Sequence, residues 1–249
     1  MDSPLPCPAL VVFDLDGTLI DSAPDLCAAV AAALDQVGLP PHNVDAIRRM
    51  IGEGQRVLIE RAITQAGGSG RVDLDDVLRR FRQYYSDHLV VHTTLYPGAR
   101  ELLRTLAEDA QLPVALATNK PGEWARRIVE HFGLSSYFGS ADRVLGEDDV
   151  GARKPDPRLL QTHCDRVGIA ADRTLLVGDS AIDWQTAQRA GCQFAYCTFG
   201  FGDRETLAQI QQSQLRDDRP FGSALRPYVL ETLVDLLRLP AFAGMRDGL

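Results

Sequence analysis

The hydrophobic positions of the chain form short continuous runs, separated by segments in which apolar residues recur with a helical period. The short runs cover residues 9–13, 114–118, 174–178 and 193–199. Each run is apolar almost throughout, which is typical of strands buried on both faces of a parallel sheet. The helical period falls between them, at residues 98–110, 123–132, 157–167 and 181–190. This alternation predicts an α/β fold, a parallel sheet core with helices on both faces.

Residues 22–93 break the alternation, because they contain helical patterns and no convincing strand. The helices are expected at residues 22–37, 44–51, 55–65 and 74–89. Ser22 and Asp25 have the spacing of a capping box at the start of the first of them. We therefore expect two domains, a core of residues 1–20 and 94–249 and an inserted all-helical cap of residues 21–93. The hinges are expected near residues 19–22 and 93–97.

The last fifty residues carry a weaker pattern. Residues 209–218 are rich in Gln and Asp, which predicts a loop, and a final helix is expected at residues 228–237.

Composition limits the possible functions. The 249 residues include 26 basic and 34 acidic side chains, a net charge of −8, and this balance disfavours general nucleic-acid binding. No stretch approaches the roughly 18 apolar residues of a membrane span, and the N-terminus lacks the pattern of a signal peptide. The five cysteines form no C-x-x-C pair, which predicts reduced thiols and a cytoplasmic location.

Acidic and polar side chains follow the predicted strands at the point where each strand ends. Asp14 and Asp16 follow the first strand, Thr118 is the last residue of the second, and Asp179 follows the third. In a parallel sheet these ends share one edge, where ligands bind. A turn would explain the D-x-D-G pattern as well, and Lys154 beside a proline is compatible with a solvated loop. Their convergence on one edge favours a site.

The residue types at this edge point to one kind of chemistry. Carboxylates are hard oxygen ligands that suit Mg²⁺, and acidic groups held together repel one another unless a cation is bound. Lys154 and the Thr118 hydroxyl can bind phosphate oxygens. One aspartate can act as a nucleophile, and a second, two residues on, as a general acid and base. The sequence therefore predicts metal-assisted phosphoryl transfer.

Four ordered motifs resemble those of the haloacid dehalogenase superfamily of phosphatases, over roughly residues 9–202. They are Phe13-Asp14-Leu15-Asp16-Gly17-Thr18-Leu19, Thr118-Asn119-Lys120-Pro121, Lys154-Pro155-Asp156-Pro157 and Val177-Gly178-Asp179-Ser180 with Asp183. Within the superfamily the chain looks like the phosphoglycolate phosphatases, on Asp21-Ser22-Ala23-Pro24-Asp25-Leu26, Ile51-Gly52-Glu53-Gly54 and Tyr96-Pro97-Gly98. The residues Ala181-Ile182 and Gly200-Phe201-Gly202 depart from the pattern of that subgroup and leave the substrate open.

The resemblance implies a Rossmann-like core, a Mg²⁺ cofactor and specific roles. Asp14 would be the nucleophile and a metal ligand, and Asp16 the general acid and base, with its backbone carbonyl on the metal. Thr118 and Asn119 would hold the transferring phosphoryl group, and Lys154 would bridge it to Asp14. Asp179 would be a metal ligand, and Asp183 would orient the water molecules bound to the metal.

Substrate choice is expected to lie in the loop of residues 51–56. Gly52 lets the backbone approach a ligand closely, Glu53 adds a polar group, and Arg56 is able to bind a carboxylate in a bidentate manner. An ordinary helix–helix turn with an exposed arginine is the alternative. Trp124 and Trp184 fall on helical faces and are expected to pack rather than bind.

The expected function is Mg²⁺-dependent hydrolysis of 2-phosphoglycolate through an aspartyl-phosphate intermediate. The alternatives are the same chemistry on a sugar phosphate, such as N-acetylmuramic acid 6-phosphate, or on a nucleotide. A phosphomutase and a catalytically silent binding protein are less favoured. The expected partner is a small phosphorylated metabolite, with no nucleic acid and no membrane, and the chain is expected to be a monomer or a homodimer.

Overall fold

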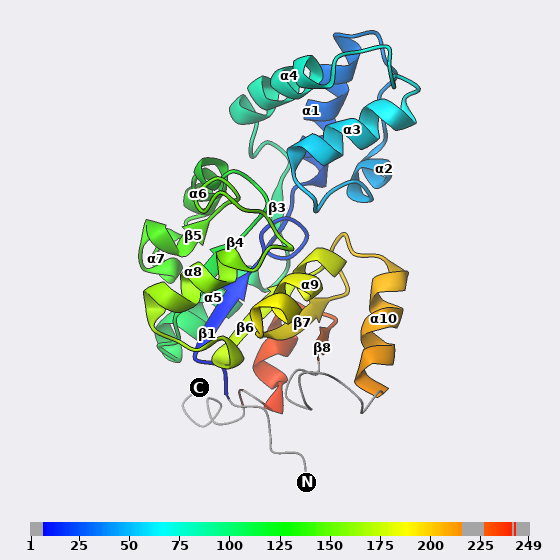
Figure 1. Ribbon diagram of the computed structural model, residues 1–249. Coiled ribbons are helices and arrows are strands. Elements are labelled where there is room, and N and C mark those ends of the chain that lie inside the picture. The colour runs from blue at the N-terminus through cyan, green and yellow to red at the C-terminus, as the bar shows by residue number, and fades with distance from the viewer. Residues whose placement is uncertain (1–6, 216–226, 241, 243–249) are drawn as a thin grey trace.

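A six-stranded parallel sheet forms the centre of the molecule. The computed structural model describes residues 7–215, 227–240 and 242. The strand order is β5-β4-β1-β6-β7-β8 (Figure 1). The strands are β1 Leu10–Phe13, β4 Val114–Ala117, β5 Val144–Leu145, β6 Thr174–Gly178, β7 Gln193–Cys197 and β8 Tyr228–Leu230. The sheet and its flanking helices confirm the predicted Rossmann-like α/β fold.

Successive residues of each strand feed two hydrophobic clusters on opposite faces of the sheet. Val11 and Phe13 lie in one cluster, and Leu10 and Val12 lie in the other. All four side chains are fully buried, as the uninterrupted apolar runs predicted. The first cluster includes side chains of α5 Ala99–Arg104, α6 Gly122–His131 and α7 Ser135–Phe138. The second includes those of α8 Arg158–Val167, α9 Ala181–Ala190 and α10 Arg204–Leu215.

Four helices form a separate helical block beyond the carboxyl ends of the strands (Figure 1). They are α1 Ala23–Asp35, α2 Val44–Arg48, α3 Gln55–Gln65 and α4 Leu74–Asp87. Two short antiparallel strands, β2 Ile20–Asp21 and β3 Thr94–Leu95, join the block to the sheet. The helices lie close to where the helical period placed them.

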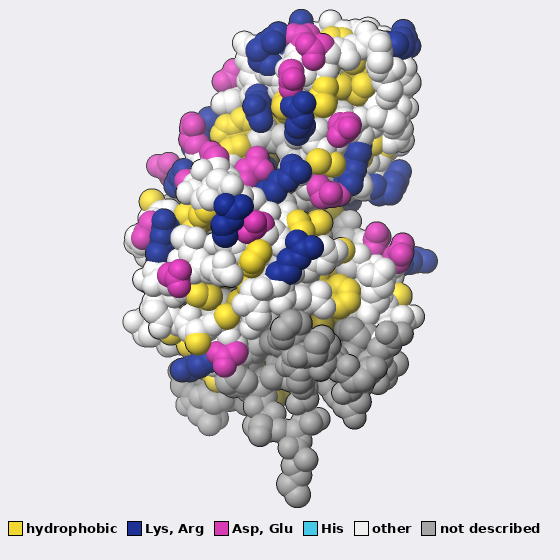
Figure 2. Space-filling view, in the orientation of Figure 1, with side chains coloured by type: hydrophobic (Ala, Val, Ile, Leu, Met, Phe, Trp, Pro, Cys, Tyr) yellow, Lys and Arg dark blue, Asp and Glu magenta, His cyan; other side chains and the backbone are white. Residues whose placement is uncertain are grey.

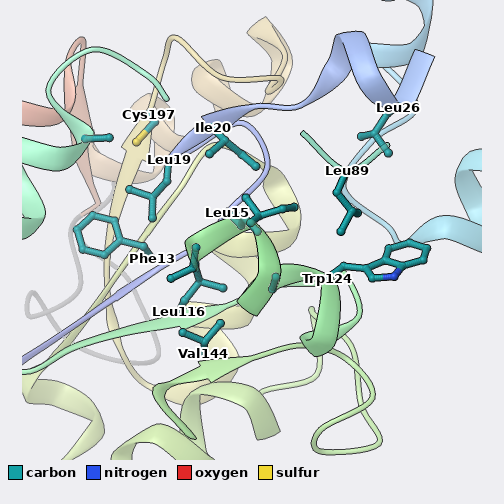
Figure 3. Close-up of a cluster of buried hydrophobic side chains, with 14 of the residues drawn as sticks. Phe13, Leu15, Leu19, Ile20, Leu26, Leu89, Leu116, Trp124, Val144 and Cys197 are labelled. Atoms are coloured by element: carbon teal, nitrogen blue, oxygen red, sulfur yellow. The ribbon is translucent and has the colours of Figure 1, made fainter. Parts of the chain in front are cut away.

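The helical block and the sheet share a continuous apolar seam (Figure 3). Leu15 follows β1, and Trp124 lies on α6. Leu26 of α1 and Leu89, just after α4, lie in the same buried cluster. Burial of these side chains favours the closed arrangement of the block over the sheet.

Asp25 links the segment that enters the helical block to the segment that returns from it to the sheet. Its carboxylate accepts hydrogen bonds from the backbone N–H groups of Val91, His92 and Thr93 at 2.8–3.0 Å, and from the Thr93 hydroxyl at 2.7 Å. Burial opposes ionisation, but these bonds hold the pKa of Asp25 below its ordinary value. The predicted capping box is therefore wrong, since Asp25 binds the returning chain, and the Ser22 hydroxyl donates to Asp16 instead.

The C-terminal part departs from the sequence-based prediction. The predicted loop at residues 209–218 is helical up to Leu215, as the end of α10, and its remainder lies outside the described residues. The predicted helix at 228–237 begins instead as β8, followed by a 3-10 helix, Leu233–Arg238. β8 pairs in parallel with β7. Pairing with a distant strand outweighs the local helical pattern.

The surface carries both signs of charge. Acidic and basic side chains are interspersed over the face in Figure 2, which shows no large area of a single sign. Among the described residues, no helix combines the length and apolar character that a bilayer span requires.

Candidate active site

Three neighbouring strands deliver polar residues to one edge of the sheet. Asp14, Thr118 and Asp179 directly follow β1, β4 and β6, which are adjacent in the sheet. The Asp14 N–H donates to the Val177 carbonyl at 2.9 Å, so strand pairing extends one residue past the end of β1. The predicted convergence of these residues is present because the parallel ladder aligns the strand ends.

Three aspartates form a buried acidic cluster at this edge. Carboxylate oxygens of Asp14, Asp179 and Asp183 all lie within 4.8 Å of one another, and all three residues are buried. Burial raises the pKa of Asp14 to about 7 and that of Asp179 well above its ordinary value, and Asp183 adds to both shifts. Ionisation of all three carboxyl groups is therefore unfavourable unless positive charge lies nearby.

Lys154 supplies the positive charge next to the acidic cluster. Its Nζ lies 2.7 Å from Asp14 Oδ1 and 2.6 Å from Asp183 Oδ1, with only 2% of the side chain exposed. Burial disfavours the ammonium, but Asp14 and Asp183 raise the pKa of Lys154 above its ordinary value. One ammonium among three carboxylates leaves an excess negative charge, which a divalent cation would compensate.

The surroundings of Asp179 fit a metal ligand with a fixed orientation. Its oxygens accept hydrogen bonds from the Thr18 hydroxyl at 3.2 Å and from the Phe201 N–H at 2.5 Å. Gly17 has a φ of 89°, and a Cβ there or at Gly200 would collide with the Asp179 side chain. The hard oxygen donors, their burial and their uncompensated charge fit Mg²⁺.

Asp16 lies apart from the acidic cluster. Its Oδ1 accepts a hydrogen bond from the Ser22 hydroxyl at 2.5 Å and lies 2.9 Å from Lys120 Nζ. Lys120 also donates to the Tyr85 hydroxyl at 2.7 Å, and Tyr85 belongs to α4 of the helical block. Asp16 is therefore held by the helical block on one side and by the loop after β4 on the other.

A small cavity of about 50 Å³ lies between the helical block and the sheet edge. Its lining combines the reactive groups at the sheet edge with side chains of the block. The lining residues are Asp14, Asp16, Leu26, Ile51, Gly52, Gly54, Gln55, Leu58, Tyr85, Thr118, Asn119, Lys120, Trp124 and Lys154. The cavity is thus lined jointly by Asp14, Asp16, Thr118 and Lys154.

Asn119 lines the cavity, but its side chain is occupied by protein partners. Its Oδ1 accepts from the Lys154 N–H at 2.6 Å, and its Nδ2 donates to the carbonyls of Lys154 and Gly52 at 3.0 and 2.9 Å. The side chain therefore links the loop that carries Lys154 to the helical block. The contact of Asn119 with a phosphoryl group stays a prediction.

The three residues expected to select the substrate do not share one position in the structure. Gly52 lines the cavity, and its carbonyl accepts from Asn119. The Glu53 carboxylate pairs with Arg61 instead. Arg56 pairs with Asp75 at 2.5 Å and has 52% of its side chain exposed, so it points away from the cavity.

Four side chains at the cavity went unassigned or were expected to have only a packing role. Lys120 is part of the second motif, but no role followed from its position there. Gln55 lies within residues 51–56, where substrate choice was expected, but it was given no role of its own. Tyr85 comes from α4, whose sequence carries only an amphipathic pattern. Trp124 packs as expected, edge-on to Tyr85 with ring centroids 5.3 Å apart, and it also lines the cavity.

Comparisons with known proteins agree on one family. Residues 11–197 match the model of the haloacid dehalogenase-like hydrolases. A phosphoglycolate phosphatase of Pseudomonas putida is 37% identical over 216 residues, covering 85% of this chain and 77% of the relative. One of Chromobacterium violaceum is 38% identical over 205 residues, covering 79% and 88%. A crystal structure of a predicted phosphoglycolate phosphatase from Haemophilus somnus superposes with a TM-score of 0.79 at 30% identity, over 93% of this chain and 97% of the other.

Proposed function

Since the chain belongs to the haloacid dehalogenase-like hydrolases, as an enzyme of the phosphatase type, we propose that it hydrolyses 2-phosphoglycolate to glycolate and phosphate with Mg²⁺. The observation that carries the proposal is the cavity that Asp14, Asp16 and Lys154 line together. A nucleophile, an acid and base and a phosphate-binding cation meet there in one space.

Asp14 is the nucleophile in this proposal. A carboxylate oxygen of Asp14 attacks phosphorus, and the bond from phosphorus to the ester oxygen breaks, which leaves an aspartyl phosphate. Lys154, 2.7 Å from Asp14, balances charge on the phosphoryl oxygens, and the buried Thr118 hydroxyl donates to them. Water then attacks the phosphoenzyme and releases phosphate.

Asp16 serves as the general acid and then the general base. It protonates the departing glycolate oxygen, and afterwards takes a proton from the attacking water. Its hydrogen bond from Ser22 and its ion pair with Lys120 hold the carboxyl group in one orientation beside the cavity. A carboxyl group held in one orientation favours proton transfer to and from a bound ester.

Mg²⁺ would be held by Asp14, Asp179 and the backbone carbonyl of Asp16, with Asp183 behind them. When bound it neutralises the cluster and the charge of the phosphoryl group. Both Asp183 oxygens already accept hydrogen bonds, one from Lys154 at 2.6 Å and the other from the Ser180 hydroxyl at 2.5 Å. This supports an orienting role for Asp183 rather than a direct ligand role.

The lining of the cavity favours a small substrate. Leu58, Tyr85 and Trp124 lie around the reactive groups, and this arrangement suits an ester with few atoms beside the phosphate better than a phosphorylated amino sugar or a nucleotide. The helical block, residues 21–93, acts in this proposal as a cap domain that excludes bulk water during the reaction. We place the enzyme in the cytoplasm, a reducing compartment that suits five free cysteines.

The test is a comparison of phosphate esters by kcat/KM, with purified protein and Mg²⁺. The panel holds 2-phosphoglycolate, a sugar phosphate, N-acetylmuramic acid 6-phosphate and a nucleotide. We expect a clear preference for 2-phosphoglycolate. If another ester gives the highest kcat/KM, the proposed substrate is wrong. Conversion of an ester to an isomeric phosphate would indicate a mutase. If no ester is turned over, the proposed phosphatase mechanism is wrong.

A further inference from the structure

One buried hydrogen-bond donor at the cavity has no partner among the described residues. Gln55 opens α3 and is 93% buried, with a relative exposure of 7%. Its Oε1 accepts from Arg82 Nε at 2.8 Å, and this contact sets the amide orientation because Arg Nε only donates. The amide Nε2 is left without a hydrogen-bond partner, and Gln55 lines the cavity.

An unpaired buried donor is costly, because it has given up its hydrogen bond to water and gained none in return. Such a group in a cavity calls for an explanation, and a ligand that supplies an acceptor is one. The contact with Arg82 fixes the amide, and the side chain that carries it lines the cavity. The position of Gln55 therefore indicates an acceptor group on the bound ligand.

Lys120 provides a cation at the same cavity. Its Nζ touches Asp16 Oδ1 at 2.9 Å and the Tyr85 hydroxyl at 2.7 Å, and it lies 4.8 Å from the centre of the Tyr85 ring. The remaining lining from the helical block includes apolar side chains, such as Leu26 and Leu58. An ammonium and an unpaired amide N–H at one cavity, beside apolar side chains of the helical block, are the donors that recognition of a small anion needs.

We propose that Gln55 and Lys120 form the subsite that recognises the carboxylate of the substrate, a short phosphate ester with a carboxyl group next to the ester carbon. The inference rests on the proposed phosphatase function and adds to it the residues that select the substrate. Gln55 Nε2 donates to one carboxylate oxygen, and Lys120 supplies the charge. Arg56, which was expected in this role, pairs with Asp75 outside the cavity.

The experiment compares two esters of similar size, 2-phosphoglycolate and ethyl phosphate, which lacks the carboxylate. The variant Gln55→Glu keeps an oxygen for Arg82 but replaces the free N–H group by a carboxylate oxygen. We expect it to lower the preference for 2-phosphoglycolate, as the ratio of kcat/KM values, by at least about tenfold, mainly through KM. A buried polar site discriminates strongly because its groups lose their partners with the wrong ligand.

The matched control is Gln65→Glu, the same chemical change at the exposed end of the same helix. It is expected to leave the preference as in the wild type. If Gln55→Glu behaves like this control, the carboxylate subsite is wrong.

A second variant keeps the proposal testable if Gln55→Glu does not fold. Lys120→Gln removes the cation, and we expect the rate with 2-phosphoglycolate to fall further than the rate with ethyl phosphate. An equal loss for both esters would overturn the role of Lys120 in carboxylate recognition. Measurements on the wild type distinguish failure of the carboxylate subsite from failure of the phosphatase function. Equal kcat/KM for the two esters would overturn the subsite alone, whereas no turnover of any ester would overturn the phosphatase function.

Discussion

Asp14 is the residue on which the proposed chemistry depends. The change Asp14→Asn keeps the size of the side chain but removes the nucleophilic oxygen pair. We expect turnover to fall by about a thousandfold or more. The fold should survive, because Asn places no charge in a buried site where burial raises the pKa of the carboxyl to about 7. Steady-state kinetics with 2-phosphoglycolate and circular dichroism measure the two effects.

The control for this change is Asp75→Asn, at an exposed aspartate of α4 that pairs with Arg56. It should leave kcat near the wild-type value. Equal activity of Asp14→Asn and the wild type would show that Asp14 is not the nucleophile.

His163 makes the free energy of unfolding depend on pH. The residue is fully buried, its Nε2 donates to the Leu116 carbonyl at 3.0 Å, and its Nδ1 has no partner among the described residues. Burial lowers its pKa from 6.5 to about 4. Between these values the unfolded chain binds a proton that the folded chain does not, so the free energy of unfolding decreases as the pH falls.

The loss expected from His163 is about 3 kcal/mol between pH 7 and pH 4. Urea unfolding of wild type and His163→Gln at several pH values, with saturating Mg²⁺, measures it. The variant should show a smaller decrease over this range. Parallel curves for the two proteins would show that His163 is not the source of the acid sensitivity.

Among the elements, α9 connects stability with the metal site. Its N-terminal capping box joins Ser180 and Asp183. The Ser180 hydroxyl accepts from the Asp183 N–H at 3.2 Å and donates to Asp183 Oδ2 at 2.5 Å. The change Ser180→Ala should lower the free energy of unfolding by about 1 kcal/mol and should also weaken Mg²⁺ binding, because Asp183 loses its orientation.

A second capping box supplies the matched control. Thr232 and Asp235 form the same arrangement at the start of the 3-10 helix Leu233–Arg238. The change Thr232→Ala should cost a similar free energy of unfolding, measured by urea denaturation. Mg²⁺ affinity, measured by calorimetry, should stay unchanged in this variant. An equal effect of both variants on Mg²⁺ affinity would contradict the role given to α9.

At the scale of the whole molecule, the charge of the acidic cluster links Mg²⁺ to stability. Without metal, the raised pKa of Asp14 means that the folded chain holds a proton between about pH 4 and 7 that the unfolded chain has lost, so this group lowers the free energy of unfolding as the pH rises. Mg²⁺ binds the ionised carboxylates, and its affinity therefore decreases as the pH falls below 7.

We expect Mg²⁺ to raise the Tm clearly at pH 8 and much less at pH 5.5. Removal of the metal by a chelator should reverse the shift. Thermal unfolding with and without Mg²⁺ measures this, and Ca²⁺ serves as a comparison because it prefers more ligands and longer bonds. A shift of the same size at both pH values would contradict a metal site made of these carboxylates.

The sequence alone was enough to predict the four central strands of the sheet and the acidic edge. Strands β1, β4, β6 and β7 are continuous apolar runs, and α9 has the predicted bounds, Ala181–Ala190. Strands β2, β3 and β5 have two residues each and leave no pattern, while β8 exists only through its pairing with β7. Short strands depend on distant partners, which local residue patterns do not record.

What only the tertiary structure decided is how the side chains around the acidic edge are divided among partners. Order along the chain placed Asp14, Thr118 and Asp179 together, because the ends of neighbouring parallel strands share one edge whatever the rest of the chain does. The pairing of Lys120 with Tyr85, of Gln55 with Arg82 and of Arg56 with Asp75 joins residues that are 19–35 positions apart. Hydrogen bonds of this kind depend on how helices pack and turn, and the amphipathic pattern of a helix specifies its buried face but not the partner of each polar group on it.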